Sequence, residues 1–167
     1  MAKRITTVGA FSALALIFSY VEVLIPFNFG IPGVKLGLAN LIVVTGLYFL
    51  NWKDVCIISL IRILISSILF GNGVSLIYSI TGGMLSFIFM AIAKKTNIFS
   101  IAGVSVIGAV FHNIGQIAAA SFIMKTIVIT YYLPILMISG VVTGFLLGIV
   151  SAKVLPILEK QMNIKTL

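Results

Sequence analysis

The sequence is short of charge, and above all of acidic residues. Aspartate and glutamate together number 3 among 167 residues, charged residues make up 8%, and hydrophobic residues make up 61%. Soluble domains carry roughly 25% charged residues, so this chain has too few polar side chains to cover a water-soluble globule. Lipid is therefore the expected surrounding for most of its surface.

The scarcity of carboxylates also argues against several activities. Chemistry on diphosphates normally needs several carboxylates that hold Mg²⁺, and Asp54 is the only aspartate. The sequence has no glycine-rich phosphate loop with its lysine, which an ATP site would require. No nucleophile–base pair stands out, and no cysteine or carboxylate has the spacing to share a metal with His112. We therefore expect no catalytic residue, metal or cofactor in this chain itself.

The positive charges are dispersed. Eleven Lys and Arg residues give a net charge of +8, and they stand singly or in pairs between apolar runs. Nucleic-acid binding needs cations gathered on one face, so we expect no nucleic-acid partner; dispersed cations suit membrane anchoring. The single cysteine, Cys56, excludes an internal disulfide and is expected to be a small buried apolar residue.

Long apolar runs separated by short polar breaks dominate the chain. A spanning helix uses about 20 residues, and the first run is longer than the core of a signal peptide and lacks a convincing cleavage site. The second and third runs are short, which predicts tilt or cover by neighbouring protein. The sequence predicts an all-α protein, a bundle of six transmembrane helices forming one membrane domain over residues 1–167, with helices at about 5–25, 37–51, 54–70, 75–93, 101–123 and 127–152.

The cations predict the orientation of this bundle. Six spans place both termini on one side, and only Lys35 and Lys125 fall on the other. Because cytoplasmic loops carry an excess of Lys and Arg, we expect both termini in the cytoplasm of a multi-pass protein of the bacterial cell membrane. The side of the termini holds Lys3, Arg4, Lys53, Lys94, Lys95, Lys153, Lys160 and Lys165.

Polar residues inside the predicted spans fall in the middle or the outer half of the bundle. Such residues are costly in a membrane and are functional candidates by default. On the fifth helix two of them are separated by four residues and share a face. Together they predict an apolar pocket with convergent polar groups, open to the outside, formed by Lys35, Asn40, Arg62, His112, Asn113 and Gln116.

Each candidate also has a purely structural interpretation. Arg62 could extend toward the interface or pair with Glu22, and His112 could hydrogen-bond between helices. Lys35 could be a boundary charge, and the tyrosines at 131–132 could belong to an interfacial aromatic belt. The cluster is better evidence for a pocket than any one member.

Small residues recur at spacings of four on two helices. Gly140, Gly144 and Gly148 repeat on the last helix, and Gly9 and Ala13 are similarly spaced on the first. Such faces let helices approach closely in lipid. The last helix could use its face for packing within the chain or for docking of a partner membrane protein.

Two motif blocks and several single residues carry a resemblance to a known family. The chain resembles, over most of its length, the small membrane family called Gx transporter, also labelled heptaprenyl diphosphate synthase component I. The residues that carry the resemblance are Ile31–Asn40, Arg62, Gly71, Ser79–Met90 with Gly82 and Gly83, and His112–Gln116.

That family in turn is similar to the S components of energy-coupling-factor transporters, which are six-helix bundles. The resemblance implies that a small molecule is captured from outside and delivered with a transmembrane coupling subunit and two cytoplasmic ATPases. It also implies that a small-residue face on the first helix, here Gly9 and Ala13, meets the transmembrane partner.

The synthase label implies a different role. The chain would then be a non-catalytic accessory component in heptaprenyl diphosphate or quinone biosynthesis, with a soluble prenyl synthase as its partner. A structural subunit of a membrane complex is a third possibility. The carboxylate count argues against catalysis by this chain, so we expect a substrate-binding subunit for uptake of a small molecule.

Overall fold

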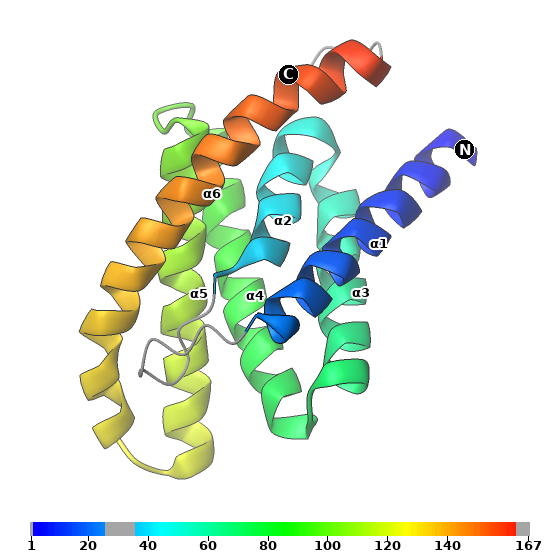
Figure 1. The fold of residues 1–167 in the computed structure, drawn as a ribbon. Helices are drawn as coiled ribbons and strands as arrows, with labels where there is room; N and C mark the ends of the chain where they lie inside the picture. Colours follow the sequence, from blue (N-terminus) through cyan, green and yellow to red (C-terminus); the bar gives the residue numbers. More distant parts are fainter. Residues whose placement is uncertain (1, 26–35, 163–167) are drawn as a thin grey trace.

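The computed structural model describes residues 2–25 and 36–162, and within these ranges the chain is all-helical (Figure 1). The described part has six α-helices and one short 3₁₀ helix, η1. The all-α prediction is confirmed for these residues. The helices are α1 (Ala2–Leu24), α2 (Leu38–Phe49), α3 (Trp52–Phe70), α4 (Gly73–Lys95), α5 (Ile101–Met124), η1 (Val128–Tyr132) and α6 (Leu133–Met162).

Four helical segments are long and apolar enough to cross a membrane: Arg4–Leu24, Gly73–Lys95, Ile101–Met124 and Val128–Gln161. The surface of the bundle is suited to lipid, because large apolar side chains are exposed on it; Phe122, for example, is 85% exposed. These features are those of a membrane helical bundle. The short α2 and the more polar α3 do not meet the same criteria.

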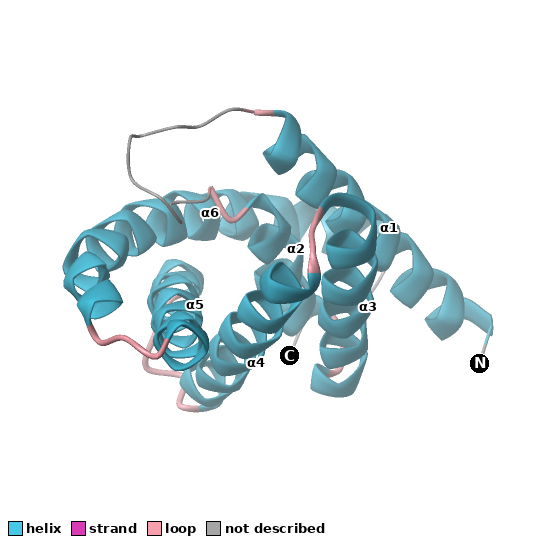
Figure 2. Cartoon of the chain, turned by 90° about the horizontal axis from the view of Figure 1, so that it is seen from below, coloured by secondary structure: helices cyan, strands magenta, loops and turns pink. Residues whose placement is uncertain are grey.

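The short α2 lies at the centre of the bundle. Its 12 residues extend about 18 Å at 1.5 Å per residue, well short of the ~30 Å hydrocarbon layer. However, α2 contacts each of the other five α-helices, and side chains such as Val43, Val44 and Leu47 are buried. Seen from below, it lies between α6 on one side and α1 and α3 on the other (Figure 2). Protein therefore covers much of this helix.

Helices α4, α5 and α6 pack through glycines. A methyl group on Gly115 of α5 would lie 2.8 Å from the Cα of Gly82 in α4, and one on Gly144 of α6 would lie 2.8 Å from the Cα of Val106 in α5. Gly140 and Gly148 likewise face α5. The repeated glycines of the last helix thus pack within the chain, because close approach lets van der Waals contact hold helices together in lipid.

Two side-chain contacts tie the helices together at the end where α1 begins and α6 ends (Figure 1). Arg4 of α1 donates to both carboxylate oxygens of Asp54 in α3, at distances of 2.6 to 3.0 Å. Lys94 of α4 donates to the carbonyl of Leu47, in the last turn of α2, at 2.6 Å. This end therefore holds several of the cations, whereas Lys125 lies at the opposite end, after α5.

The predicted sixth helix was wrong in its extent. The stretch predicted as one helix over 127–152 is divided into η1 and α6, and α6 continues ten residues further, to Met162, with Pro156 inside it. A proline inside a helix removes one backbone hydrogen bond. The helix continues because Leu155, which is 5% exposed, and Leu158 pack on a cluster that includes Phe11.

Candidate functional site

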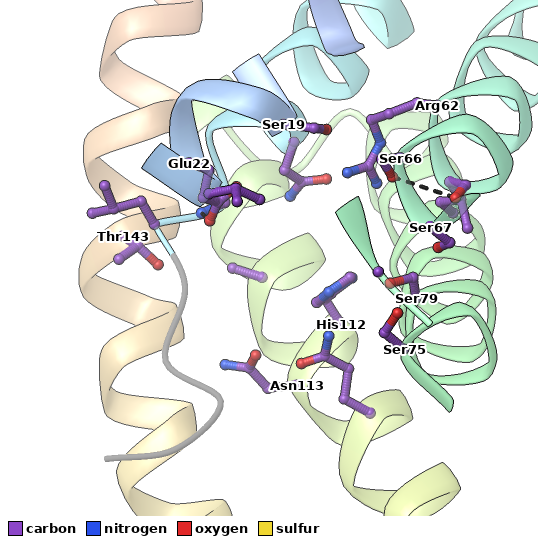
Figure 3. A pocket seen from close by; sticks show the side chains of 18 of the residues that line it. Ser19, Glu22, Arg62, Ser66, Ser67, Ser75, Ser79, His112, Asn113 and Thr143 are labelled. Atoms are coloured by element: carbon purple, nitrogen blue, oxygen red, sulfur yellow. Dashed lines mark hydrogen bonds between the residues drawn. The ribbon is translucent and has the colours of Figure 1, made fainter. Parts of the chain in front are cut away.

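A cavity of about 280 Å³ lies inside the bundle, and all six α-helices contribute to its wall (Figure 3). It reaches Gly71 and Ser75, at the turn between α3 and α4, which is the end of the bundle opposite the start of α1. Its polar lining consists of Ser19 and Glu22 from α1, Asn40 from α2, Arg62, Ser66 and Ser67 from α3, Ser75 and Ser79 from α4, His112, Asn113 and Gln116 from α5, and Thr143 from α6.

Most of the residues predicted to form a pocket meet at this cavity. Asn40, Arg62, His112, Asn113 and Gln116 all line it, although they come from three helices and span 77 positions (116 − 40 + 1) of the chain. The sixth candidate, at position 35, is outside the described residues. The structure therefore brings the five described candidates together, and their binding of a ligand remains a prediction.

The predicted docking residues lie elsewhere. Gly9 and Ala13 are on an exposed part of α1, and no described atom lies within 4 Å of a methyl group placed on Gly9. Neither residue lines the cavity. This face is free of packing within the described chain, so docking of a partner there remains a prediction.

Arg62 presents a buried hydrogen-bond donor without a partner. Its Nε atom is buried and has no hydrogen-bond acceptor among the described residues. Glu22, which also lies in the described lining, uses Oε1 to accept a hydrogen bond of 2.6 Å from the backbone N–H of Gly37. The described residues contain no direct ion pair between Arg62 and Glu22, and Figure 3 shows the two on different sides of the cavity. A direct ion pair with Glu22 therefore does not account for the burial of the Arg62 Nε atom inside the bundle.

Glycines on the neighbouring helices make room for the polar face of α5. A methyl group on Gly82 of α4 would lie 2.9 Å from Cγ of Gln116 and 3.2 Å from Cε1 of His112. A methyl group on Gly140 of α6 would lie 2.8 Å from Nδ2 of Asn113. Larger residues at either glycine would therefore displace these side chains.

Asn113 has one fixed orientation in the wall. Its Nδ2 donates to the carbonyl of Leu136, in the first turn of α6, at 2.6 Å. The same carbonyl also accepts a hydrogen bond of 2.9 Å from Oγ of Ser139, and the bond from Nδ2 leaves Oδ1 of Asn113 to accept from another group. Asn113 thus has both a structural role and a free acceptor.

The hydroxyl groups of the cavity were not predicted as site residues from the sequence. Serine and threonine are only weakly polar and are common in membrane helices, so their presence there does not by itself indicate a site. Their spacing held a signal: Ser66 follows Arg62 by four residues, and Ser75 and Ser79 are also four apart, so each pair shares a helix face. Thr143 of α6 adds a further hydroxyl to the lining.

The described lining offers many hydrogen-bonding groups but few charges. It contains one guanidinium, one carboxylate and one imidazole, together with amides and hydroxyls. The described residues contain no group of three or more His, Cys, Asp or Glu side chains that could hold a metal ion. A wall of this composition can orient a small polar molecule by hydrogen bonds and can neutralise one negative charge.

Comparison with known proteins identifies a family. The sequence profile of a family described as heptaprenyl diphosphate synthase component I matches residues 11–154, most of the chain and all of the cavity lining named above. Neither a curated protein nor a solved structure matches the chain.

Proposed function

This chain belongs to the heptaprenyl diphosphate synthase component I family, and we propose that it is the substrate-binding membrane subunit of an uptake system for a small molecule. The observation that carries the proposal is the cavity of about 280 Å³ to which every α-helix contributes polar side chains. Membrane helices bury such groups only at a cost. A wall of this kind is accounted for by a bound polar molecule.

We place the cavity in the outer half of a six-span bundle in the bacterial cell membrane. The cations Lys53, Lys94 and Lys95 lie at the end where α1 begins, and the positive-inside rule assigns that end to the cytoplasm. The cavity reaches the α3–α4 turn at the other end. In this orientation a solute arriving from outside meets the polar groups first.

Energy for uptake would come from other subunits. The sequence lacks a phosphate loop for ATP, and the exposed face with Gly9 and Ala13 on α1 is available for a helix of another membrane protein. In this proposal the chain docks through that face on a transmembrane coupling subunit, which carries two cytoplasmic ATPases. Solute capture is followed by docking and by release into the cytoplasm.

The description of the family suggests a second candidate function. A heptaprenyl diphosphate synthase component could be a membrane accessory of a soluble prenyl synthase, which would supply the catalytic carboxylates that this chain lacks. Under that alternative the cavity would have no transported ligand. Both candidates assign catalysis to another protein.

Native purification distinguishes the two. The full chain, tagged at its C-terminus and extracted in mild detergent from its own membrane, is analysed by mass spectrometry of the associated proteins. We expect a transmembrane subunit and an ATPase pair in stoichiometric amounts. Recovery of a soluble prenyl synthase without ATPases would contradict uptake and support the accessory role.

A further inference from the structure

We propose that the cavity selects a small molecule that carries a single carboxylate at one end and N–H donors at the other. The inference rests on the proposed function, because it names the class of solute that the same cavity would capture. It follows from Arg62, from the number of charges in the described lining, and from the acceptors that lie across the cavity.

Arg62 offers an unpaired donor to an anion. Its Nε is buried without an acceptor among the described residues, and leaving a buried donor unpaired costs free energy. Nε and a terminal nitrogen of a guanidinium form two parallel N–H donors, which match the two oxygens of a carboxylate. Figure 3 shows the guanidinium directed toward the cavity. An incoming carboxylate would complete its hydrogen bonding.

The charges of the lining suit a monoanion. Arg62 is the only Lys or Arg in the described lining, and Glu22 contributes a negative charge. A diphosphate would bring several negative charges into this low-dielectric site, where one guanidinium cannot neutralise them. The described lining also lacks the several carboxylates with which proteins hold Mg²⁺ on such groups. A single carboxylate brings one negative charge, which can pair directly with the Arg62 guanidinium, while Glu22 already accepts a hydrogen bond from the backbone N–H of Gly37.

Hydrogen-bond acceptors lie on the other side. Glu22 accepts a hydrogen bond from the backbone N–H of Gly37 through Oε1, and its carboxylate has a second oxygen that can accept. Nδ2 of Asn113 donates a hydrogen bond to the carbonyl of Leu136, which leaves Oδ1 of Asn113 available as an acceptor. Figure 3 shows Glu22 and Asn113 away from Arg62. A ligand held by Arg62 at its carboxylate would therefore present N–H groups to these acceptors.

The volume of the cavity limits the size of the ligand. Pockets for drug-sized ligands occupy roughly 300–1,000 Å³, and this cavity, at about 280 Å³, lies just below that range. A single ring or a short chain with two polar ends fits such a space. A heptaprenyl tail does not.

Four probes test the class by thermal denaturation of the purified full chain in detergent. 4-Aminobenzoate has the proposed carboxylate and N–H donors, 4-aminobenzamide lacks the charge, benzoate lacks the donors, and inorganic diphosphate carries excess charge. Since hydrogen bonds to charged groups are the strong ones, 4-aminobenzoate is expected to bind on the order of tenfold to a hundredfold more tightly than 4-aminobenzamide. It should also bind more tightly than benzoate or diphosphate.

Variants connect the selectivity to the two ends of the cavity. Arg62→Ala should abolish the preference for 4-aminobenzoate over 4-aminobenzamide. Arg62→Lys keeps the positive charge but lacks the two parallel N–H donors of the guanidinium, so it should retain part of that preference. Glu22→Gln should reduce the preference for 4-aminobenzoate over benzoate. The matched control is Lys125→Asn, which removes an exposed cation at the same end of the bundle and keeps a residue that tolerates the positive φ of that position.

The outcomes separate this inference from the proposed function. Tighter binding of diphosphate or of 4-aminobenzamide, or no stabilisation by any probe, overturns the substrate class. Loss of selectivity in Lys125→Asn equal to that in Arg62→Ala overturns the role of Arg62. None of these results affects the copurification of ATPases, which tests uptake independently.

Discussion

The close contact between α4 and α5 at Gly115 supports a quantitative prediction. A methyl group at this position would lie 2.8 Å from the Cα of Gly82 and 2.8 Å from the carbonyl oxygen of Thr81. Both atoms belong to the backbone, so no side chain can rotate away. Ordinary contacts begin at 3.4 Å, so the added methyl falls short by 3.4 − 2.8 = 0.6 Å and the two helices must separate.

Two terms decide the net effect of Gly115→Ala. Overpacking of a close-packed contact typically costs about 1–3 kcal/mol, whereas alanine in place of glycine favours a helix by up to ~1 kcal/mol. We therefore expect the free energy of unfolding to fall by roughly 1–2 kcal/mol. The separation also moves His112 and Gln116, on the same helix, away from the facing wall, so 4-aminobenzoate should bind more weakly.

Denaturant titration in detergent micelles measures this change. Gly73→Ala at the start of α4 is the matched control, because no described atom lies within 4 Å of the added methyl group. That variant should be neutral or slightly stabilising. If Gly115→Ala is as stable as Gly73→Ala, the α4–α5 contact is looser than described and the reasoning fails.

Three further predictions concern other contacts. Arg4→Ala should lower the melting temperature in detergent because it removes the guanidinium that pairs with the buried carboxylate of Asp54, whereas Arg4→Lys should restore part of the loss; equal melting temperatures for the wild type and both variants would refute this prediction. Lys94→Met should lower the free energy of unfolding by about 1 kcal/mol, since the hydrogen bond to the carbonyl of Leu47 is lost, and an unchanged denaturation midpoint would refute it. Gly9→Leu should reduce copurification of the ATPase pair while leaving probe binding intact, because the added side chain projects from an exposed face; full copurification would place docking elsewhere.

The sequence predicted the all-helical architecture and the meeting of polar residues well. Arg62 and the polar face of α5 stand out because charges and amides are rare in such apolar helices. Successive helices run in opposite directions, so the position of each polar residue along its helix was enough to predict that they lie at a similar depth. Asn40 joins them from the central helix α2. Rare polar residues in lipid-embedded sequence are therefore informative about a site.

Other features depend on tertiary contacts that a single sequence does not display. The end of α6 was misjudged because packing of Leu155 and Leu158 keeps the helix intact beyond Pro156. The choice between a packing face and a docking face at Gly144 could be made only once α5 was seen against it. The hydroxyl groups of Ser66 and its neighbours gained meaning only from their position around the cavity.

The central claim is that the cavity opens to the outside of the cell, and cysteine labelling tests it most directly. With the native cysteine removed as Cys56→Ala, single cysteines are introduced as Ser79→Cys in the cavity wall and as Lys95→Cys at the opposite end of α4. In intact cells a membrane-impermeant maleimide should label the cavity position, and 4-aminobenzoate should slow that reaction, while the position at 95 reacts only after permeabilisation. Labelling of position 95 in intact cells, with position 79 protected until the membrane is opened, would contradict the account.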